Sequence, residues 1–172
     1  MCSYIDLTNV PEGGFTASED IVCYKVLKRN NNCLESPVTK FCYKIGKTVK
    51  KCQIVLSDKK VLNTVVYRLR EKTLYKLLLT ENHYLFSTTN LMKFVGIKDS
   101  GLAETTTGYY SFTGYMNGEM KRLVKIMLDV WDCPIVVRCT IPKGSKYYVS
   151  DNSETFVSNQ LKVEHIVNEF EI

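Results

Sequence analysis

The hydrophobic positions in this chain follow two periods, and the shorter period predicts most of the secondary structure. Compact runs of β-branched and aromatic residues, bounded by turn-forming residues, indicate strands. These runs are 20–28 (DIVCYKVLK), 38–49 (VTKFCYKIGKTV), 52–56 (CQIVL), 84–86, 134–141 (PIVVRCTI) and 160–172 (QLKVEHIVNEFEI). The run at 134–141 is β-branched and continuous, which predicts a buried central strand. Residues 160–172 alternate with acids, which predicts one or two edge strands.

The helical period occurs in three places. Residues 58–79 repeat apolar side chains at spacings of three and four, which predicts a helix capped by Asp58 that runs to about Arg70 and continues to Leu79. A short helix is predicted at 87–96. The best amphipathic pattern is at 118–132, where one stripe holds Met120, Leu123, Val124, Met127, Leu128 and Trp131.

Turn signals separate these elements. Proline and glycine predict an irregular segment at 1–20. In CTIPKGSKYYVSD (139–151), Pro142 fixes φ, Gly144 permits a turn, and the tyrosines that follow restart β-type sequence. The stretch therefore predicts a turn between two strands. Strands with segregated helices in 172 residues predict one α+β domain with a mixed, strongly twisted sheet and a few helices.

The basic residues are concentrated in one part of the chain. Residues 25–76 hold 14 Lys and Arg against 3 acids (+11), whereas the rest holds 9 against 15 (−6). This polarity suits an anionic partner, which is a nucleic acid, an acidic protein surface or the opposite end of another copy. The alternative is a solvated basic face without a partner. The expected contact surface consists of Lys44, Lys47, Lys50, Lys51, Lys59, Lys60, Arg68 and Arg70.

The seven cysteines are expected to be unpaired, because their number is odd and no pair has the C-x-x-C spacing of a zinc or redox site. Cys23, Cys42 and Cys139 lie in apolar or aromatic runs, where a free thiol behaves as a small hydrophobe. Reduced thiols predict a cytoplasmic protein without a bound metal. No apolar run approaches the roughly 18 residues of a membrane span, and no signal peptide is evident, so no membrane association is expected.

Nucleotide and acid–base motifs are weak. The tetrapeptide IGKT (45–48) ends like a P-loop, but that motif needs glycine where Phe41 stands, and β-type sequence follows instead of a helix. His83 and His165 have no accompanying catalytic motif. The stretch TTGYYSFTGYMNG (106–118) is rich in hydroxyls and tyrosines. It is either a loop entering the following helix or a ligand wall in which Tyr109 or Tyr110 stacks on a ring and Ser111 bonds a sugar.

The order of CYKVL, GYYSF, VVRCTIPKGSKYY and FVSNQLKVEHI loosely resembles the plan of the ADP-ribosyltransferase-like superfamily over residues 20–168. The ending IPKG-x-x-YY also resembles small uncharacterised proteins of phages and gut bacteria. The superfamily resemblance implies NAD contacts at Tyr24, Tyr109 and Ser111.

The same resemblance implies a late glutamate that supports transfer, within a Glu-x-Glu or Gln-x-Glu motif. Here Ser158 and Gln160 stand at those places and the next acid is Glu164. An amide carries no charge to stabilise an oxocarbenium-like state, and losing such stabilisation costs roughly 100- to 1000-fold in rate. The chain therefore departs from the catalytic pattern at its decisive residue, with Glu164 or Gln160 as the candidates.

The first functional hypothesis is a non-catalytic binding or assembly protein without a cofactor. It would be encoded by a phage or mobile element, as a virion component or host-interaction protein in the host cytoplasm. Its basic region would contact an anionic partner or neighbouring subunits. The alternatives are an ADP-ribosyltransferase that uses NAD to modify a macromolecule and a nucleic-acid-binding module.

Overall fold

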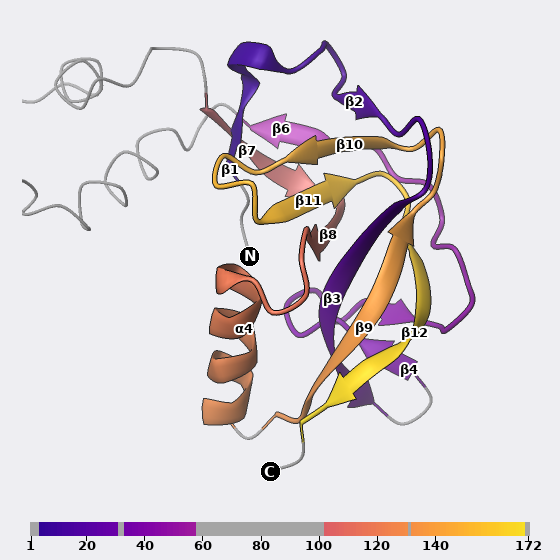
Figure 1. Cartoon of the computed structure of the whole chain (residues 1–172), viewed down its shortest axis with the longest axis vertical. Coiled ribbons are helices and arrows are strands. Elements are labelled where there is room, and N and C mark those ends of the chain that lie inside the picture. The colour runs from indigo at the N-terminus through magenta and orange to yellow at the C-terminus, as the bar shows by residue number, and fades with distance from the viewer. Residues whose placement is uncertain (1–3, 31–32, 58–101, 131, 171–172) are drawn as a thin grey trace, which may run out of the picture.

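A long central strand, β3, organises the described part of the chain, which comprises residues 4–30, 33–57, 102–130 and 132–170 of the computed structural model (Figure 1). The larger sheet has the order β12-β9-β3-β8-β11-β10-β2, in which β4 also pairs with β3 and β5 pairs with β4, and the smaller sheet has the order β1-β7-β6. The strands are β1 (Tyr4–Asp6), β2 (Phe15–Thr16), β3 (Ile21–Asn30), β4 (Cys33–Glu35), β5 (Cys42–Tyr43), β6 (Val55–Ser57), β7 (Leu102–Thr107), β8 (Tyr109–Phe112), β9 (Pro134–Ile141), β10 (Lys146–Val149), β11 (Thr155–Ser158) and β12 (Lys162–Glu169). With the 3-10 helix Leu7–Asn9 and the α-helix α4 (Gly118–Asp129), the described residues form a mostly β, α+β-like domain.

The prediction of a mixed sheet is wrong for the described strands, because every pairing among them is antiparallel. Parallel neighbours require a crossover between adjacent strands. Here α4 carries the chain from β8 to β9, but these two strands lie on opposite edges of β3. Each is antiparallel to β3, so the crossover creates no parallel pair.

The strand predictions are confirmed for three runs of the larger sheet. The runs at 20–28 and 134–141 form β3 and β9, and the run at 160–172 supplies the edge strand β12. Between β9 and β10 the predicted turn is confirmed: Ser145 N–H donates to the Pro142 carbonyl at 3.0 Å, and Gly144 has φ of +81°. The predicted strand at 84–86 and the helices predicted at 58–79 and 87–96 lie outside the described residues.

Helix α4 forms where the sequence predicts it, although it ends at Asp129 rather than 132. Asn117 caps its first turn by accepting from Met120 N–H at 3.0 Å, and the Glu154 carboxylate accepts from Glu119 N–H at 2.8 Å. Both satisfy amides that a helix start leaves unpaired. The described part of the predicted apolar stripe is the buried face, and it packs on one side of the sheet in a cluster comprising Met120, Val124, Met127, Val26, Phe112 and Val136. Trp131 lies outside the described residues. No described helix has the length and apolar character to cross a membrane.

The run at 38–49, predicted to be strand material closed by Gly46, forms a strand only at Cys42–Tyr43. Beyond β5 the chain follows β12 through separate backbone bonds, from Gly46 N–H to the Val163 carbonyl at 2.7 Å and from Val49 N–H to the Leu161 carbonyl at 2.9 Å. A ring results: β3 pairs with β4 and β4 with β5, the chain continues from β5 into residues 46–52, and these residues bond to β12, which pairs with β9 and so returns to β3.

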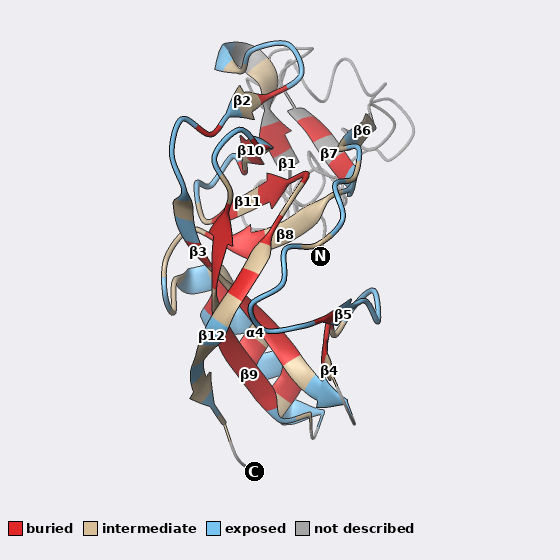
Figure 2. Ribbon diagram, turned by 90° about the vertical axis from the view of Figure 1, so that its right-hand side faces the viewer, coloured by how far each residue is buried: buried red, intermediate tan, exposed pale blue. Residues whose placement is uncertain are grey.

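The interior of this ring is the second hydrophobic core, on the sheet face opposite α4. Its buried side chains come from every strand of the ring, and they are Cys23, Leu27, Leu34, Tyr43, Ile135, Val137, Cys139, Ile141, Leu161 and Val163. Figure 2 shows the buried surfaces of β3 and β9 running through the middle of the molecule. Two apolar faces therefore meet along β3 and β9, which explains why most residues of β9, and residues 23–27 of β3 except Tyr24, are buried.

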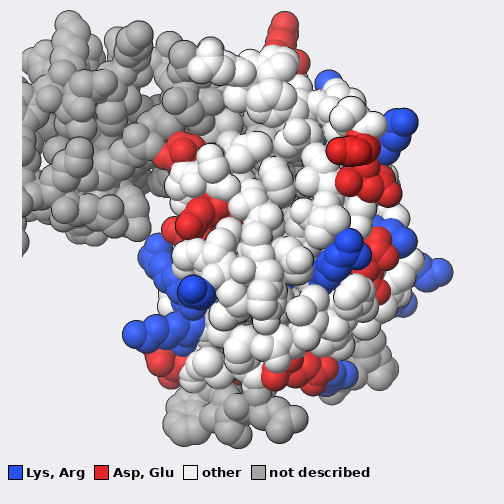
Figure 3. Space-filling view, in the orientation of Figure 1, with Lys and Arg blue, Asp and Glu red and all other residues white. Residues whose placement is uncertain are grey.

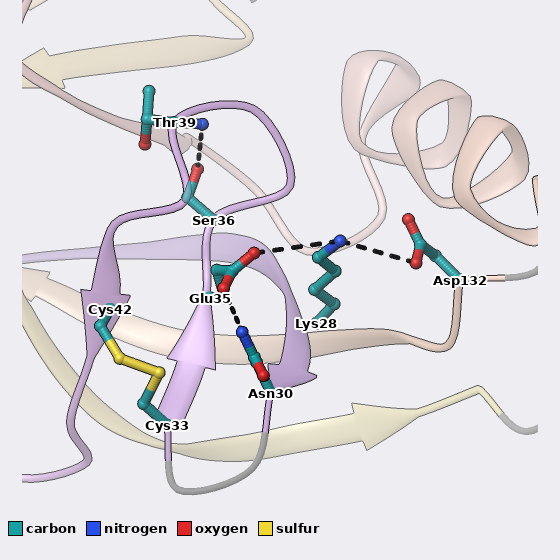
Figure 4. Close-up of polar contacts among 8 residues, drawn as sticks. All are labelled: Lys28, Asn30, Cys33, Glu35, Ser36, Thr39, Cys42 and Asp132. Carbon is teal, nitrogen blue, oxygen red and sulfur yellow. Dashed lines mark hydrogen bonds and ion pairs between the residues drawn. A yellow bond between two sulfur atoms is a disulfide. The ribbon is translucent and has the colours of Figure 1, made fainter.

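The prediction that all cysteines are unpaired is wrong, because Cys33 and Cys42 form a disulfide (Figure 4). The register of β4 and β5 places Glu35 opposite Cys42 and brings the two cysteine Cα atoms to 5.7 Å, within the range that a disulfide spans. The nine-residue separation belongs to neither a zinc nor a redox motif. The two cysteines come together because β4 and β5 pair, and no local sequence motif signals that pairing. The free cysteines of the described residues are Cys23, Cys52, Cys133 and Cys139.

Replacing both bonded cysteines, Cys33→Ser/Cys42→Ser, is expected to lower the free energy of unfolding by about 2 to 3 kcal/mol, because the unfolded chain regains the entropy of a short loop. Urea denaturation of the oxidised protein measures the loss. The matched control is Cys133→Ser, at an exposed free thiol. Equal stability of the double variant and the control would contradict the disulfide, as would a thiol titration in denaturant that finds no two additional thiols after reduction.

Candidate functional site

One edge of β3 has a gap in its pairing. On this edge β8 meets β3 at Tyr24, and β4 meets it from Lys28 onward. No described strand pairs with this edge at residues 25–27. A cavity of about 80 Å³ opens there, and its described lining includes Lys25, Ser36, Tyr43, Tyr110, Ser111 and Phe112.

Lys25 is a buried cation in this cavity. Its side chain lies on the same face of β3 as Cys23 and Leu27, and the residue is 8% exposed. Its ammonium donates to the Tyr110 carbonyl and lies over the Tyr43 ring, 5.2 Å from the centroid. Among the described residues no carboxylate pairs with it. An unpaired charge is costly to bury, and this burial lowers the pKa of Lys25 to about 8.

The groups around Lys25 are neutral near pH 7. Burial raises the pKa of Cys23 to about 11, and it raises the pKa values of Cys139 and Tyr43 further above their ordinary range. None of these side chains therefore supplies a negative charge at neutral pH. With a pKa about one unit above neutrality, Lys25 itself is roughly nine-tenths protonated at pH 7.

The Ser111 hydroxyl is the second polar group of the cavity without a full set of partners. The residue is 1% exposed, and its Oγ has no hydrogen-bond partner among the described residues. The Cys23 thiol interacts with this hydroxyl without forming a hydrogen bond of ordinary geometry, and a thiol is a weak partner in any case. Buried hydroxyls are normally hydrogen-bonded, so an unpaired one requires an explanation.

The opposite wall of the cavity is the loop that the disulfide closes. Ser36 to Thr39 join β4 to β5 and lie between Cys33 and Cys42. Ser36 is buried, whereas Val38 is 60% exposed and forms part of the rim. Near the other wall, Gly108 has φ of +137°, and a Cβ there would collide with the Val157 side chain.

The same loop is anchored to the β3 end by polar contacts (Figure 4). The Glu35 carboxylate accepts from the Asn30 side chain and lies 3.9 Å from the Lys28 ammonium, which is also 3.7 Å from Asp132. Ser36 Oγ accepts from Thr39 N–H at 3.5 Å. The disulfide and these contacts hold the cavity wall against β3.

The residues expected to contact NAD do not share one cleft. Tyr24 faces α4 and packs on Tyr115 with ring centroids 5.6 Å apart, whereas Ser111 faces the ring interior. The Tyr109 hydroxyl donates to the Lys50 carbonyl at 2.7 Å, and the Tyr110 hydroxyl donates to the Thr105 carbonyl at 2.6 Å. Both tyrosines are therefore bound within the protein. The stretch at 106–118 forms part of β7, the strand β8 and the entry to α4, and only its Gly108–Phe112 part contributes to the cavity wall.

Neither candidate for the late glutamate belongs to the cavity lining described above. Glu164 lies on the edge strand β12 and pairs with Lys162 at 3.1 Å, and the hydrogen bond from Lys162 lowers the pKa of its carboxyl. Gln160 precedes β12, and its carbonyl accepts from Ser158 Oγ at 2.8 Å. Ser111 thus lines the same cavity as Lys25, whereas Glu164 and Gln160 do not line it.

Five lysines of residues 40–51 are exposed and form a surface that we call the basic strip: Lys40, Lys44, Lys47, Lys50 and Lys51. The segment contains no acid, and none of the five forms an ion pair with a described residue. In Figure 3 basic side chains gather at the right-hand edge, where the chain after β5 runs in Figure 1, and over α4. Phe41 and Ile45 lie between the lysines and are 41% and 50% exposed.

The other basic residues of 25–76 are buried, form ion pairs or lie outside the described residues. Lys25 is buried, Lys28 pairs with two acids, and Arg29 binds Glu169 at 2.6 Å. The remaining members of the predicted contact surface are not described: Lys59, Lys60, Arg68 and Arg70. Within the described ranges, no group of three His, Cys, Asp or Glu side chains is placed to hold a metal ion.

Comparison of the chain with protein-family models, with curated proteins and with solved structures finds no match. The resemblance to the ADP-ribosyltransferase-like superfamily therefore remains an expectation of the sequence.

Sequence reasoning missed the role of Lys25, which it counted among the basic residues. A signal was present: in the alternation of IVCYKVL, Lys25 occupies an inward-facing position between Cys23 and Leu27. A lysine at a core position of a strand is rare unless it is paired.

Lys25 is expected to make stability depend on pH in a defined window. Its folded pKa of about 8 lies below the ordinary value of 10.5, so the unfolded state binds more protons between these values and stability rises with pH there. Lys25→Met lacks this contribution. The stability advantage of Lys25→Met over the natural protein should therefore shrink by roughly 1 kcal/mol per pH unit above about pH 8.

Urea denaturation at half-unit steps from pH 7 to 9.5 measures this difference. The thiols and Tyr43 titrate in both proteins, so the comparison cancels their effect, which has the opposite sign. Parallel stability curves for the two proteins would show that Lys25 has an ordinary pKa.

Proposed function

We propose that this chain is a non-catalytic assembly protein whose basic strip contacts an acidic protein surface, in the first instance that of a neighbouring copy. The observation that carries the proposal is the exposure of five lysines within 12 residues that contain no acid. Lysines at this density raise the local potential well above that expected from the net charge of +5. A phage or mobile-element origin, and a place in a virion or the host cytoplasm, belong to the same proposal.

A protein partner fits the strip better than a nucleic acid does. Phe41 and Ile45 present apolar surface between the lysines, as expected of an interface with an apolar centre and a charged rim. Phe41 makes edge contacts with Tyr43 and Tyr109, with centroids 4.9 and 5.8 Å apart, so its ring already belongs to an aromatic cluster within the protein. The residues outside 25–76 carry a net charge of −6, which is opposite in sign to that of the basic strip.

The alternative function, NAD-dependent ADP-ribosyl transfer to a macromolecule, requires an acidic group beside the NAD site. Tyr24 and Ser111 lie on opposite faces of the sheet, and Glu164 pairs with Lys162 on β12. This arrangement favours the assembly function. Incubation with labelled NAD tests the alternative, and transfer of label to any protein would establish it.

The assembly proposal predicts association that depends on salt and on the basic strip. Sedimentation velocity of the full chain should find oligomers in low salt that dissociate at about 0.5 M salt, where charges are screened beyond about 4 Å. Lys47→Glu/Lys50→Glu/Lys51→Glu should sediment as a monomer in both conditions. Each substitution is at an exposed residue and should change the free energy of unfolding by less than about 0.5 kcal/mol.

The matched control reverses three exposed lysines elsewhere, Lys121→Glu/Lys125→Glu/Lys143→Glu, with the same change in net charge. This control should still associate. A natural protein that remains monomeric in low salt would contradict self-assembly. Salt-sensitive binding of duplex DNA that is lost in the first triple variant, and kept in the control, would replace it with nucleic-acid binding.

A further inference from the structure

The cavity beside Lys25 has features of a binding site that are independent of the basic strip. An ammonium has three N–H donors, and only the bond to the Tyr110 carbonyl is made to a described residue. The Ser111 hydroxyl is buried and unpaired in the same cavity. We propose that this cavity binds a small organic carboxylate with a short apolar tail.

The charge of the ligand follows from the groups that surround Lys25. Cys23, Cys139 and Tyr43 face the ammonium from β3, β9 and β5, and their raised pKa values keep them neutral at pH 7. Tyr110 contributes its carbonyl from β8, which offers only a partial charge. A carboxylate would supply the missing negative charge and would accept from both Lys25 and Ser111, which forms charge-assisted hydrogen bonds.

A single negative charge suits the cavity better than a phosphate does. Lys25 is the one cationic side chain among the described lining residues, and the amides at the start of α4 are already capped by Asn117 and Glu154. A dianion would therefore leave charge uncompensated in a buried site. The remaining lining includes Val26, Phe112 and Leu123, which favours an apolar tail.

The size and access of the cavity limit the ligand. Its volume of about 80 Å³ is roughly half that of the ~150 Å³ cavity known to hold benzene, so the buried part has about three to five non-hydrogen atoms. The rim contains the exposed Val38 and Thr39 on the loop between the bonded cysteines. A ligand therefore reaches Lys25 from the side of this loop.

Propionate is the probe that tests the proposal, with propionamide as its uncharged counterpart and inorganic phosphate, a mixture of monoanion and dianion at pH 7, as the larger and more highly charged anion. Chemical-shift titrations of the full chain at pH 7 should give a dissociation constant for propionate in the millimolar range. Propionamide and phosphate should bind at least tenfold more weakly. Between pH 7 and 9 the propionate affinity should fall several-fold, because Lys25 loses its proton while the surrounding thiols and Tyr43 stay largely neutral.

The variants are chosen to preserve the fold. Lys25→Met should weaken propionate binding at least tenfold, and Ser111→Ala should weaken it about tenfold. Ser145 supplies a matched control, since its hydroxyl is also buried and unpaired but does not line the cavity. Ser145→Ala should bind propionate as the natural protein does.

Four results would overturn the proposal. They are no titratable shifts up to about 50 mM propionate, equal affinity for propionamide, tighter binding of phosphate, and unchanged propionate affinity in folded Lys25→Met or Ser111→Ala. The Lys25 and Ser111 variants leave the basic strip unchanged, so the proposal can fail while self-assembly persists, and the reverse also holds.

Discussion

The ammonium of Lys25 is buried in the middle of β3, and the described structure around it must accommodate that charge. β3 packs against α4 on one face and closes the ring of strands on the other, so a side chain at position 25 can only point into a core. The gap between β8 and β4 gives this side chain a cavity in place of a strand. The backbone carbonyl of Tyr110 and the ring of Tyr43 then stabilise the charge without neutralising it.

The disulfide and the cavity belong to one piece of local structure. The Cys33–Cys42 bond closes the loop that carries the rim, and Tyr43, which lies over the ammonium, directly follows the second cysteine. The Lys28–Glu35 contact anchors the same loop to the end of β3. A disulfide persists most readily in an oxidising environment, so the pairing bears on the expected cytoplasmic location as well as on the stability of the cavity wall.

The local pattern of apolar and turn-forming residues predicted the elements whose residues are set by which faces are buried or by backbone preferences. β9 is apolar because both of its faces are covered, α4 shows its stripe because one face packs on β3, and the turn at Pro142–Gly144 follows from backbone preferences. The ring closure, the disulfide and the cavity depend on which distant strands become neighbours. Residues 46–52 bond to β12 more than a hundred residues away, and no local period encodes that pairing. Sequence reasoning did single out Ser111, but for a nucleotide site that would include Tyr24, because it had no means of placing the two residues on opposite faces.

The most direct test of this account is the pKa of Lys25 itself, measured by the pH titration of its side-chain Cε and Hε resonances with and without propionate. Lys25→Met identifies the signal by its loss. The account predicts a pKa of about 8 in the free protein, held down by burial without a counter-charge, and a clear rise when propionate is bound. A Lys25 that titrates at the ordinary value of 10.5, and does so equally with and without the carboxylate, would contradict it.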